Sequence, residues 1–148
     1  MKSFLLIFLI LNIISFSFTQ EIIIDVRGYY KNDEIVMNNG NKLVHLSSKG
    51  NWNDNLNNYG RVFCKGSIMM NKDGKRSENE LVLCEAEDVN GDFFWLVPKR
   101  SDSEWDAGVG KASIVSATGK YKNLLNKNCI YAVSYYKDTF HSRTKCEK

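Results

Sequence analysis

The chain beyond residue 20 consists of short apolar runs that are separated by Gly, Asn and Asp. No stretch keeps a helical period for three turns, and Ile, Val, Tyr, Phe and Thr dominate the runs, as is typical of strands. The nearest helix candidate is the two-turn segment Lys120–Asn126. The pattern predicts an all-β fold with eight or nine strands: Glu21–Tyr30, Glu34–Met37, Lys42–Leu46, Gly60–Met70, Glu80–Asp88, Asp92–Val97, Gly110–Thr118, Cys129–Tyr136 and Thr139–Cys146.

The last two runs form a hairpin whose register follows from its turn. A two-residue turn at Lys137-Asp138 places Tyr136 opposite Thr139. Pairing outward from there brings Cys129 opposite Cys146, at a pair without ladder hydrogen bonds, where the Cα atoms lie about 4.5 Å apart. A disulfide can bridge that distance. The register therefore predicts the disulfide Cys129–Cys146.

The earlier hairpin, from Gly60 to Asp88, predicts a second bridge. A turn at Asp73-Gly74 brings Cys64 opposite Cys84 across a longer loop. Four cysteines allow three pairings, and only this one joins neighbours within each hairpin. Zinc is the competing interpretation, but the spacings contain no short Cys-x-x-Cys knuckle. We therefore expect two hairpin disulfides and no metal site.

Alternation assigns one face of each hairpin to the interior. Beside Cys129 and Cys146, the inward side chains are those of Tyr131, Val133, Tyr135, Phe140, Ser142 and Thr144. In the earlier hairpin, Cys64 and Cys84 share the inner face with Val62, Ile68, Met70, Val82 and Ala86. Many strands in a short chain must hide their edges, and closure does so. We predict a small antiparallel eight-stranded β-barrel, with a β-sandwich as the alternative.

The first 19 residues have a different pattern. Lys2 precedes an apolar run from Phe4 to Leu11 that continues through Ile14, and small polar residues follow up to Thr19. This is the pattern of a cleaved secretory signal peptide, with a short membrane anchor as the alternative. The prediction divides the chain into a signal peptide, residues 1–19, and a single domain, residues 20–148. Export to an oxidising compartment agrees with paired cysteines.

Composition and charge exclude several classes of protein. Of the 148 residues, 43% are hydrophobic and 25% are charged, which is typical of one folded domain and excludes a disordered chain. Cleavage after Thr19 would remove one lysine and lower the net charge from +3 to +2. We interpret three small basic groups as solvated surface: Lys72-Lys75-Arg76, Lys99-Arg100 and His141-Arg143-Lys145. No concentrated basic patch is present, so we expect no nucleic-acid partner. We also expect a monomer.

The usual catalytic signatures are absent from the sequence. There is no Gly-x-Ser-x-Gly, no phosphate-binding Gly loop and no His-Glu-x-x-His. We interpret the two histidines, His45 and His141, as surface residues. The segment Asp88–Asp92 lacks the Gly position and the final Glu of a calcium loop, and we predict a hairpin turn there. The sequence thus assigns no catalytic residue and no cofactor.

Residues Asn51–Asn58 are rich in asparagine and lie beside two aromatic residues, Trp52 and Tyr59. Such a combination can bind sugars by ring stacking and amide hydrogen bonds, but we interpret the stretch as a polar surface loop. Gly50-Asn51-Trp52 also resembles the Gly-x-Trp signature of lipocalins, a resemblance that would imply a ligand-holding barrel.

The segment from Gly108 to Tyr121 is the most distinctive part of the sequence. Its strand ends in Thr118-Gly119-Lys120-Tyr121. It resembles the strand ending in Gly-Thr-Gly-Lys-Tyr of small secreted bacterial barrels akin to the allene oxide cyclase and dirigent proteins, except at Ser116-Ala117, where that family prefers Gly. The resemblance implies an eight-stranded barrel with an apolar cavity and, in some members, cyclisation or coupling of a bound substrate. No catalytic residue of those enzymes maps onto this chain.

The leading functional hypothesis is a secreted or periplasmic binding module for a small apolar ligand. In it, Trp95, Tyr131, Tyr135 and Phe140 line one end of the interior, and Ser142 and Thr144 supply polar contacts. The same rings can instead fill the core of so small a barrel.

Two alternatives come from other classes of protein. One is a cyclase or isomerase that confines its substrate and uses a Tyr hydroxyl as acid or base. The other is an exported protein-recognition or inhibitor module that binds an extracellular protein through Asn51–Tyr59 or Asp102–Asp106. An exposed Trp52 or Trp105 would favour this second alternative.

Overall fold

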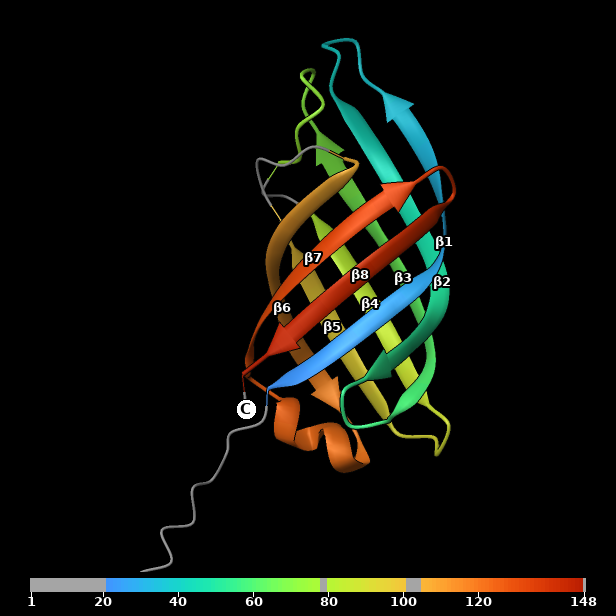
Figure 1. Ribbon diagram of the computed structural model, residues 1–148. Helices are drawn as coiled ribbons and strands as arrows, with labels where there is room; N and C mark the ends of the chain where they lie inside the picture. Colours follow the sequence, from blue (N-terminus) through green and yellow to red (C-terminus); the bar gives the residue numbers. More distant parts are fainter. Residues whose placement is uncertain (1–20, 78–79, 101–104, 148) are drawn as a thin grey trace, which may run out of the picture.

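Eight antiparallel strands pair in chain order and close into a barrel, because β1 pairs with β8 as well as with β2 (Figure 1). The structure is a computed structural model and describes residues 21–77, 80–100 and 105–147. The predicted barrel is confirmed, and the sandwich alternative is wrong. The strands are β1 (Ile22–Val36), β2 (Lys42–Asp54), β3 (Tyr59–Met70), β4 (Leu81–Asp88), β5 (Phe93–Lys99), β6 (Ala107–Ala117), β7 (Asn128–Tyr136) and β8 (Thr139–Cys146).

Strands β1 and β2 are longer than the sequence predicts. Two predicted runs merge into β1, and β2 continues from Leu46 to Asp54. Alternation persists through the polar stretch, because Trp52 and Asp54 are buried while Asn51 and Asn53 are exposed. The surface-loop interpretation of Asn51–Asn58 is therefore wrong for its first four residues, which extend the sheet.

Both predicted disulfides are present. Cys129 faces Cys146 in the β7–β8 ladder, and Cys64 faces Cys84 in the β3–β4 ladder. Each pair is bonded, with Cα atoms 4.1 Å and 4.0 Å apart, respectively. All four cysteines are thus paired, and each bond staples one hairpin. Two intramolecular disulfides indicate an oxidising, extracytoplasmic environment.

Three hairpins share one kind of turn, which begins at Asp54, Asn71 or Asp88. In each, the first side chain accepts hydrogen bonds from the backbone N–H groups two and four residues later. The residue three places later has a positive φ, which is the pattern of a three-residue hairpin loop: Asn57, Gly74 and Gly91. The predicted hairpin turn at Asp88–Asp92 is confirmed.

One end of the barrel, which we call the helix end, is covered by the 3-10 helix η1 (Gly119–Leu124) (Figure 1). This helix lies within the predicted candidate Lys120–Asn126 apart from its first residue. It buries Tyr121 and Leu124 against the barrel interior. The rings of Trp52 and Phe94 pack against Tyr121 in edge-on or tilted contacts, with centroids 5.9 Å and 5.1 Å away. Large side chains therefore fill the helix end.

The predicted signal peptide, residues 1–19, lies outside the described residues. Among the helices of the described part, none is long and apolar enough to cross a membrane.

Candidate ligand-binding site

A small interior cavity of about 80 Å³ lies in the half of the barrel away from η1. Three of the four predicted ligand-binding residues line it, namely Tyr131, Tyr135 and Phe140. The hydroxyl-bearing side chains of Ser142 and Thr144 also line it, as predicted. Sites for drug-sized ligands measure roughly 300–1,000 Å³, so side chains fill most of this barrel.

The fourth predicted residue, Trp95, does not line the cavity. Its indole Nε1 donates to the Glu85 carboxylate at 2.9 Å on the outer surface, and its ring stacks on Phe93. Phe94 takes the inward position of β5 instead and is 1% exposed. Leu96, two residues after Phe94, faces inward by alternation and lines the cavity. Placing Trp95 inside the barrel is therefore wrong.

Two arginines that we expected on the solvated surface are buried at the end opposite η1. Arg76 and Arg100 are 5% and 3% exposed, and Glu80 between them is 6% exposed. Arg76 Nη1 donates to Glu80 Oε2 at 2.9 Å, and the Arg100 backbone N–H donates to Glu80 Oε1 at 2.7 Å. We call this end of the barrel the arginine end. The solvated-surface interpretation is wrong for both arginines.

Aromatic rings enclose the arginine end. The Arg76 guanidinium lies 4.8 Å from the ring centroid of Trp105. Trp105 stacks on Tyr135, and Tyr30 meets Tyr135 edge-on. The Trp105 backbone carbonyl accepts a hydrogen bond from Arg100 Nη2 at 3.1 Å. Trp105 is thus packed against the site, while Asp102, from the same predicted recognition loop, lies outside the described residues.

Two glycines of β6 make room for this arrangement. A Cβ atom on Gly108 would lie 2.4 Å from Arg100 Nη1. A Cβ atom on Gly110 would lie 2.8 Å from the Arg100 Cβ atom and 2.7 Å from the Tyr131 ring. Because both positions lack side chains, the Arg100 chain can lie across the inner face of β6. The Gly108-Val109-Gly110 sequence is the local signal that larger groups occupy this space.

The buried charges are incompletely partnered. Four nitrogens of these two arginines are shielded from solvent and have no hydrogen-bond partner among the described residues: Arg76 Nε and Nη2, and Arg100 Nε and Nη1. Burial and the neighbouring Arg76 charge lower the pKa of Arg100. Burial and the Glu80 carboxylate raise the pKa of Tyr131 to about 12, so its hydroxyl stays protonated at neutral pH.

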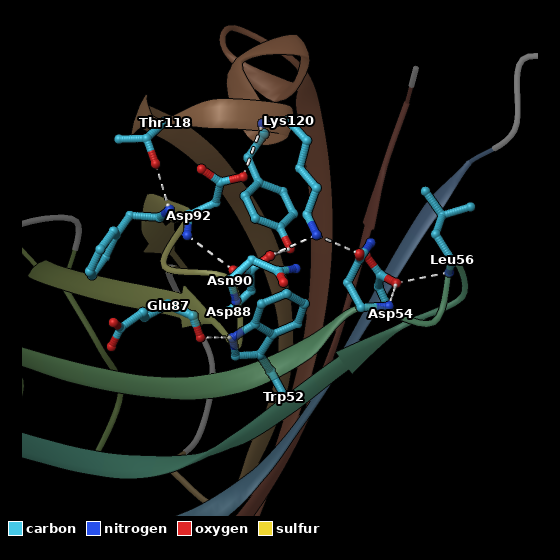
Figure 2. Close-up of polar contacts among 12 residues, drawn as sticks. Trp52, Asp54, Leu56, Glu87, Asp88, Asn90, Asp92, Thr118 and Lys120 are labelled. Carbon is cyan, nitrogen blue, oxygen red and sulfur yellow. Dashed lines mark hydrogen bonds and ion pairs between the residues drawn. The ribbon is translucent and has the colours of Figure 1, made fainter.

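The helix end contains the other group of buried polar side chains, centred on Asp88 (Figure 2). Asp88 Oδ2 accepts from Lys120 Nζ at 2.7 Å and from the Tyr121 hydroxyl at 3.0 Å. Asp88 Oδ1 accepts from the backbone N–H groups of Asn90 and Asp92. Burial alone would raise the pKa of Asp88, but these hydrogen bonds outweigh it and hold that pKa well below its usual value. Every acceptor position of this carboxylate is therefore used.

The residues of the Thr118-Gly119-Lys120-Tyr121 segment all serve the helix end. Thr118 Oγ1 accepts from the Phe93 backbone N–H at 2.7 Å and so joins β6 to β5 (Figure 2). Lys120 also donates to Asn58 Oδ1 at 2.7 Å. Burial and the Asp88 carboxylate raise the pKa of Tyr121. In this chain the side chains of Thr118, Lys120 and Tyr121 therefore hold the helix end together through contacts with residues of neighbouring strands and turns.

A larger depression of about 910 Å³ lies on the outer surface of β1 to β4, is open to solvent, and is lined by charged, amide and aromatic side chains. Three of its charged lining residues form ion pairs, since Arg61 contacts Glu87 at 2.6 Å and Asp25 contacts Arg143 at 2.7 Å. Tyr59 is exposed there, but Trp52 is 2% exposed and hydrogen-bonds to the Glu87 carbonyl. The two rings therefore form no joint platform for a sugar, and Trp52 offers no surface to a protein partner.

The two histidines lie on the outer surface, as predicted. His45 Nδ1 lies 2.9 Å from the Ser67 hydroxyl, and His141 Nε2 lies 3.5 Å from the Asp25 carboxylate. No group of three His, Cys, Asp or Glu side chains in the described ranges is arranged to hold a metal ion.

Comparison with protein-family models, curated proteins and solved structures finds no match for this chain.

Proposed function

We propose that this chain is a secreted or periplasmic barrel that binds a small, largely apolar molecule in the cavity beside Tyr131, Tyr135 and Phe140. One observation carries the proposal, namely that the two halves of the interior are filled differently. At the helix end, the almost fully buried rings of Trp52 and Phe94 pack against Tyr121, whereas the opposite half keeps the cavity. The two disulfides support a role outside the cytoplasm.

The size of the cavity limits the ligand. An apolar cavity of about 150 Å³ accepts benzene, so a cavity of about 80 Å³ suits a molecule of only a few heavy atoms. Its walls combine aliphatic side chains such as Val133 with the hydroxyls of Ser142 and Thr144. Short alcohols, ketones and acids match these walls in size and polarity.

An NMR titration of the oxidised protein with butan-1-ol tests the proposal. We expect saturable shifts at residues that line the cavity. The variant Val133→Phe fills this space and is expected to abolish them. Val109→Phe is the matched control, because Val109 is 65% exposed and points away from the interior. The proposal fails if the wild type shows no saturable shifts, or if Val133→Phe binds as well as Val109→Phe.

A second candidate, a cyclase or isomerase of the type that the Thr118–Tyr121 resemblance implies, is favoured by the charged lining of the cavity. Glu80 and Arg76 line it together with the Tyr131 side chain. With its pKa raised to about 12, the Tyr131 hydroxyl suits proton donation better than proton abstraction at neutral pH. This candidate predicts loss of turnover in Tyr131→Phe with ligand binding retained. It is wrong if no bound ligand is converted.

A further inference from the structure

The arginine end buries more positive than negative charge. Two guanidinium groups and one carboxylate are each at least nine-tenths buried, and the Arg76 and Glu80 side chains are 4% and 2% exposed. The three groups together carry a net charge of +1, which no other described carboxylate contacts. Burying such a charge is costly unless an anion or further hydrogen bonds compensate it. The described part of the chain supplies no second carboxylate contact to either arginine.

The unpartnered nitrogens of Arg76 are arranged for one kind of anion. Nη1 is held by Glu80, and the Tyr135 side chain also interacts with this guanidinium. Nε and Nη2, which form one edge of the planar group, make no hydrogen bond of standard geometry to a described residue. An edge with two parallel N–H groups matches the two oxygens of a carboxylate. The guanidinium lies over the Trp105 ring, 4.8 Å from its centroid, and this contact restrains its position. The edge is therefore preorganised before any ligand arrives.

Arg100 adds a second donor group near the first. Its Nη2 is held by the Trp105 carbonyl, while Nε and Nη1 are unpartnered among the described residues. Gly108 and Gly110 keep the space in which this side chain lies. A single negative charge balances the three buried groups, whereas a dianion would leave an excess of negative charge.

The apolar cavity adjoins these donors. Arg76 and Glu80 line it at one side, and Val133, Phe140 and Leu96 line the rest. A ligand with a carboxylate at one end and a short apolar tail would place each part against its chemical match. We propose that the barrel binds a short-chain monocarboxylate, with the carboxylate on the free edge of Arg76 and the tail in the cavity. This inference rests on the proposed function and names the class of its ligand.

The test compares butanoate with butan-1-ol, which have tails of the same length, by NMR titration and calorimetry at neutral pH. We expect butanoate to bind at least tenfold more tightly than the alcohol. Arg76→Met is expected to weaken butanoate binding tenfold or more and to leave the alcohol within about twofold. Arg76→Lys keeps the positive charge but loses the edge with two parallel N–H groups. We therefore expect its affinity for butanoate to lie between those of the wild type and Arg76→Met.

Arg61→Met is the matched control, because the Arg61 side chain is 79% exposed on the outer surface. It is expected to leave both affinities unchanged. Far-UV circular dichroism of each variant confirms that the barrel is folded. Equal affinities for the acid and the alcohol, or butanoate binding that survives Arg76→Met, would overturn the carboxylate site and leave the proposed function standing. Absence of binding by both probes would overturn the proposed function itself.

Discussion

The two ends of the barrel bury charged side chains in opposite ways. At the helix end, Asp88 accepts four hydrogen bonds from side chains and backbone. At the arginine end, the one carboxylate accepts from the Arg76 guanidinium and from the Arg100 backbone N–H, and the two guanidinium groups keep four unpartnered nitrogens among the described residues. A fully satisfied network stabilises the fold, while an unsatisfied one costs stability until a ligand completes it. The difference separates a structural group from a candidate site.

Two hairpin turns of the same type also differ in how far their first side chain is buried. Asp88 and Asn71 begin hairpin turns with the same pattern of side-chain to backbone hydrogen bonds. Asp88 is buried and also binds Lys120 and Tyr121, whereas Asn71 is exposed. The turn type is therefore shared, and burial with added partners makes one of the two turns a centre of stability.

The largest effect is expected from Asp88→Ala. It leaves Lys120, Tyr121 and two backbone N–H groups without their acceptor, so we expect a loss of about 3–5 kcal/mol in the free energy of unfolding. Asn71→Ala removes the same two turn hydrogen bonds at an exposed site and is expected to cost about 1 kcal/mol. Urea denaturation of the oxidised proteins measures both. Equal losses would mean that the turn, and not the buried network, accounts for the effect.

Acid is expected to weaken the helix end. In the folded protein the pKa of Asp88 is held below the ordinary value of 3.8, so the unfolded chain takes up this proton first as the pH falls. The stabilisation contributed by the ionised Asp88 carboxylate is therefore fully present at neutral pH and declines below about pH 5. Thermal unfolding between pH 7 and pH 3 measures the decline. Asp88→Asn is expected to make stability less dependent on pH between pH 5 and pH 3. If the variant loses stability with falling pH as steeply as the wild type, Asp88 is not the responsible group.

Alkali is expected to have a smaller effect at the same end. The pKa of Tyr121 is raised above its ordinary value of 10.0, so the unfolded chain loses the phenol proton first. The stabilisation contributed by the protonated Tyr121 hydroxyl is therefore fully present at neutral pH and declines as the pH rises above about 9. Tyr121→Phe should remove this component from unfolding curves recorded between pH 8 and pH 11. If the variant and the wild type decline in parallel, Tyr121 is not the responsible group.

The smallest effect on stability is expected from Arg76→Met at the arginine end. The substitution removes two unpartnered nitrogens and one of two neighbouring buried positive charges. It also breaks the ion pair with Glu80, but the Glu80 carboxylate keeps the hydrogen bond from the Arg100 backbone N–H and the attraction of the Arg100 guanidinium, which offset part of the cost of breaking that pair. We expect a change of no more than about 1 kcal/mol in the free energy of unfolding. If Arg76→Met lowers the free energy of unfolding as much as Asp88→Ala does, the buried charges at both ends stabilise the fold, and the two ends do not differ in this respect.

The sequence predicts the strands and both disulfides because each depends only on residues within one strand or one hairpin. A period of two and a short turn together fix which residues face each other, as the Cys129–Cys146 pair illustrates. Trp95 could not be oriented in this way, because Phe93, Phe94 and Trp95 are consecutive aromatic residues without alternation. Its direction is set by the turn that begins at Asp88, which fixes the β4–β5 register and pairs Trp95 with the outward Glu85.

The burial of Arg76 and Arg100 could not be derived from their neighbours in the sequence. Each stands next to a lysine or serine in a segment that connects strands, where a solvated side chain is the ordinary outcome. Their burial depends on Glu80, Trp105 and the space above Gly108, which come together only when the barrel closes. The glycines are visible in the sequence, but the side chain that they accommodate is not.

The pairing of β1 with β8 gives the barrel a seam between distant parts of the chain. Asp25 and Arg143, which form an ion pair across it, are 118 residues apart, whereas every other strand pair joins consecutive strands. Contacts of such long sequence separation form late in folding because loop closure is entropically costly. Neither disulfide crosses the seam. Both hairpins can therefore be oxidised before the barrel closes, and the closed barrel is held at its seam by non-covalent contacts alone.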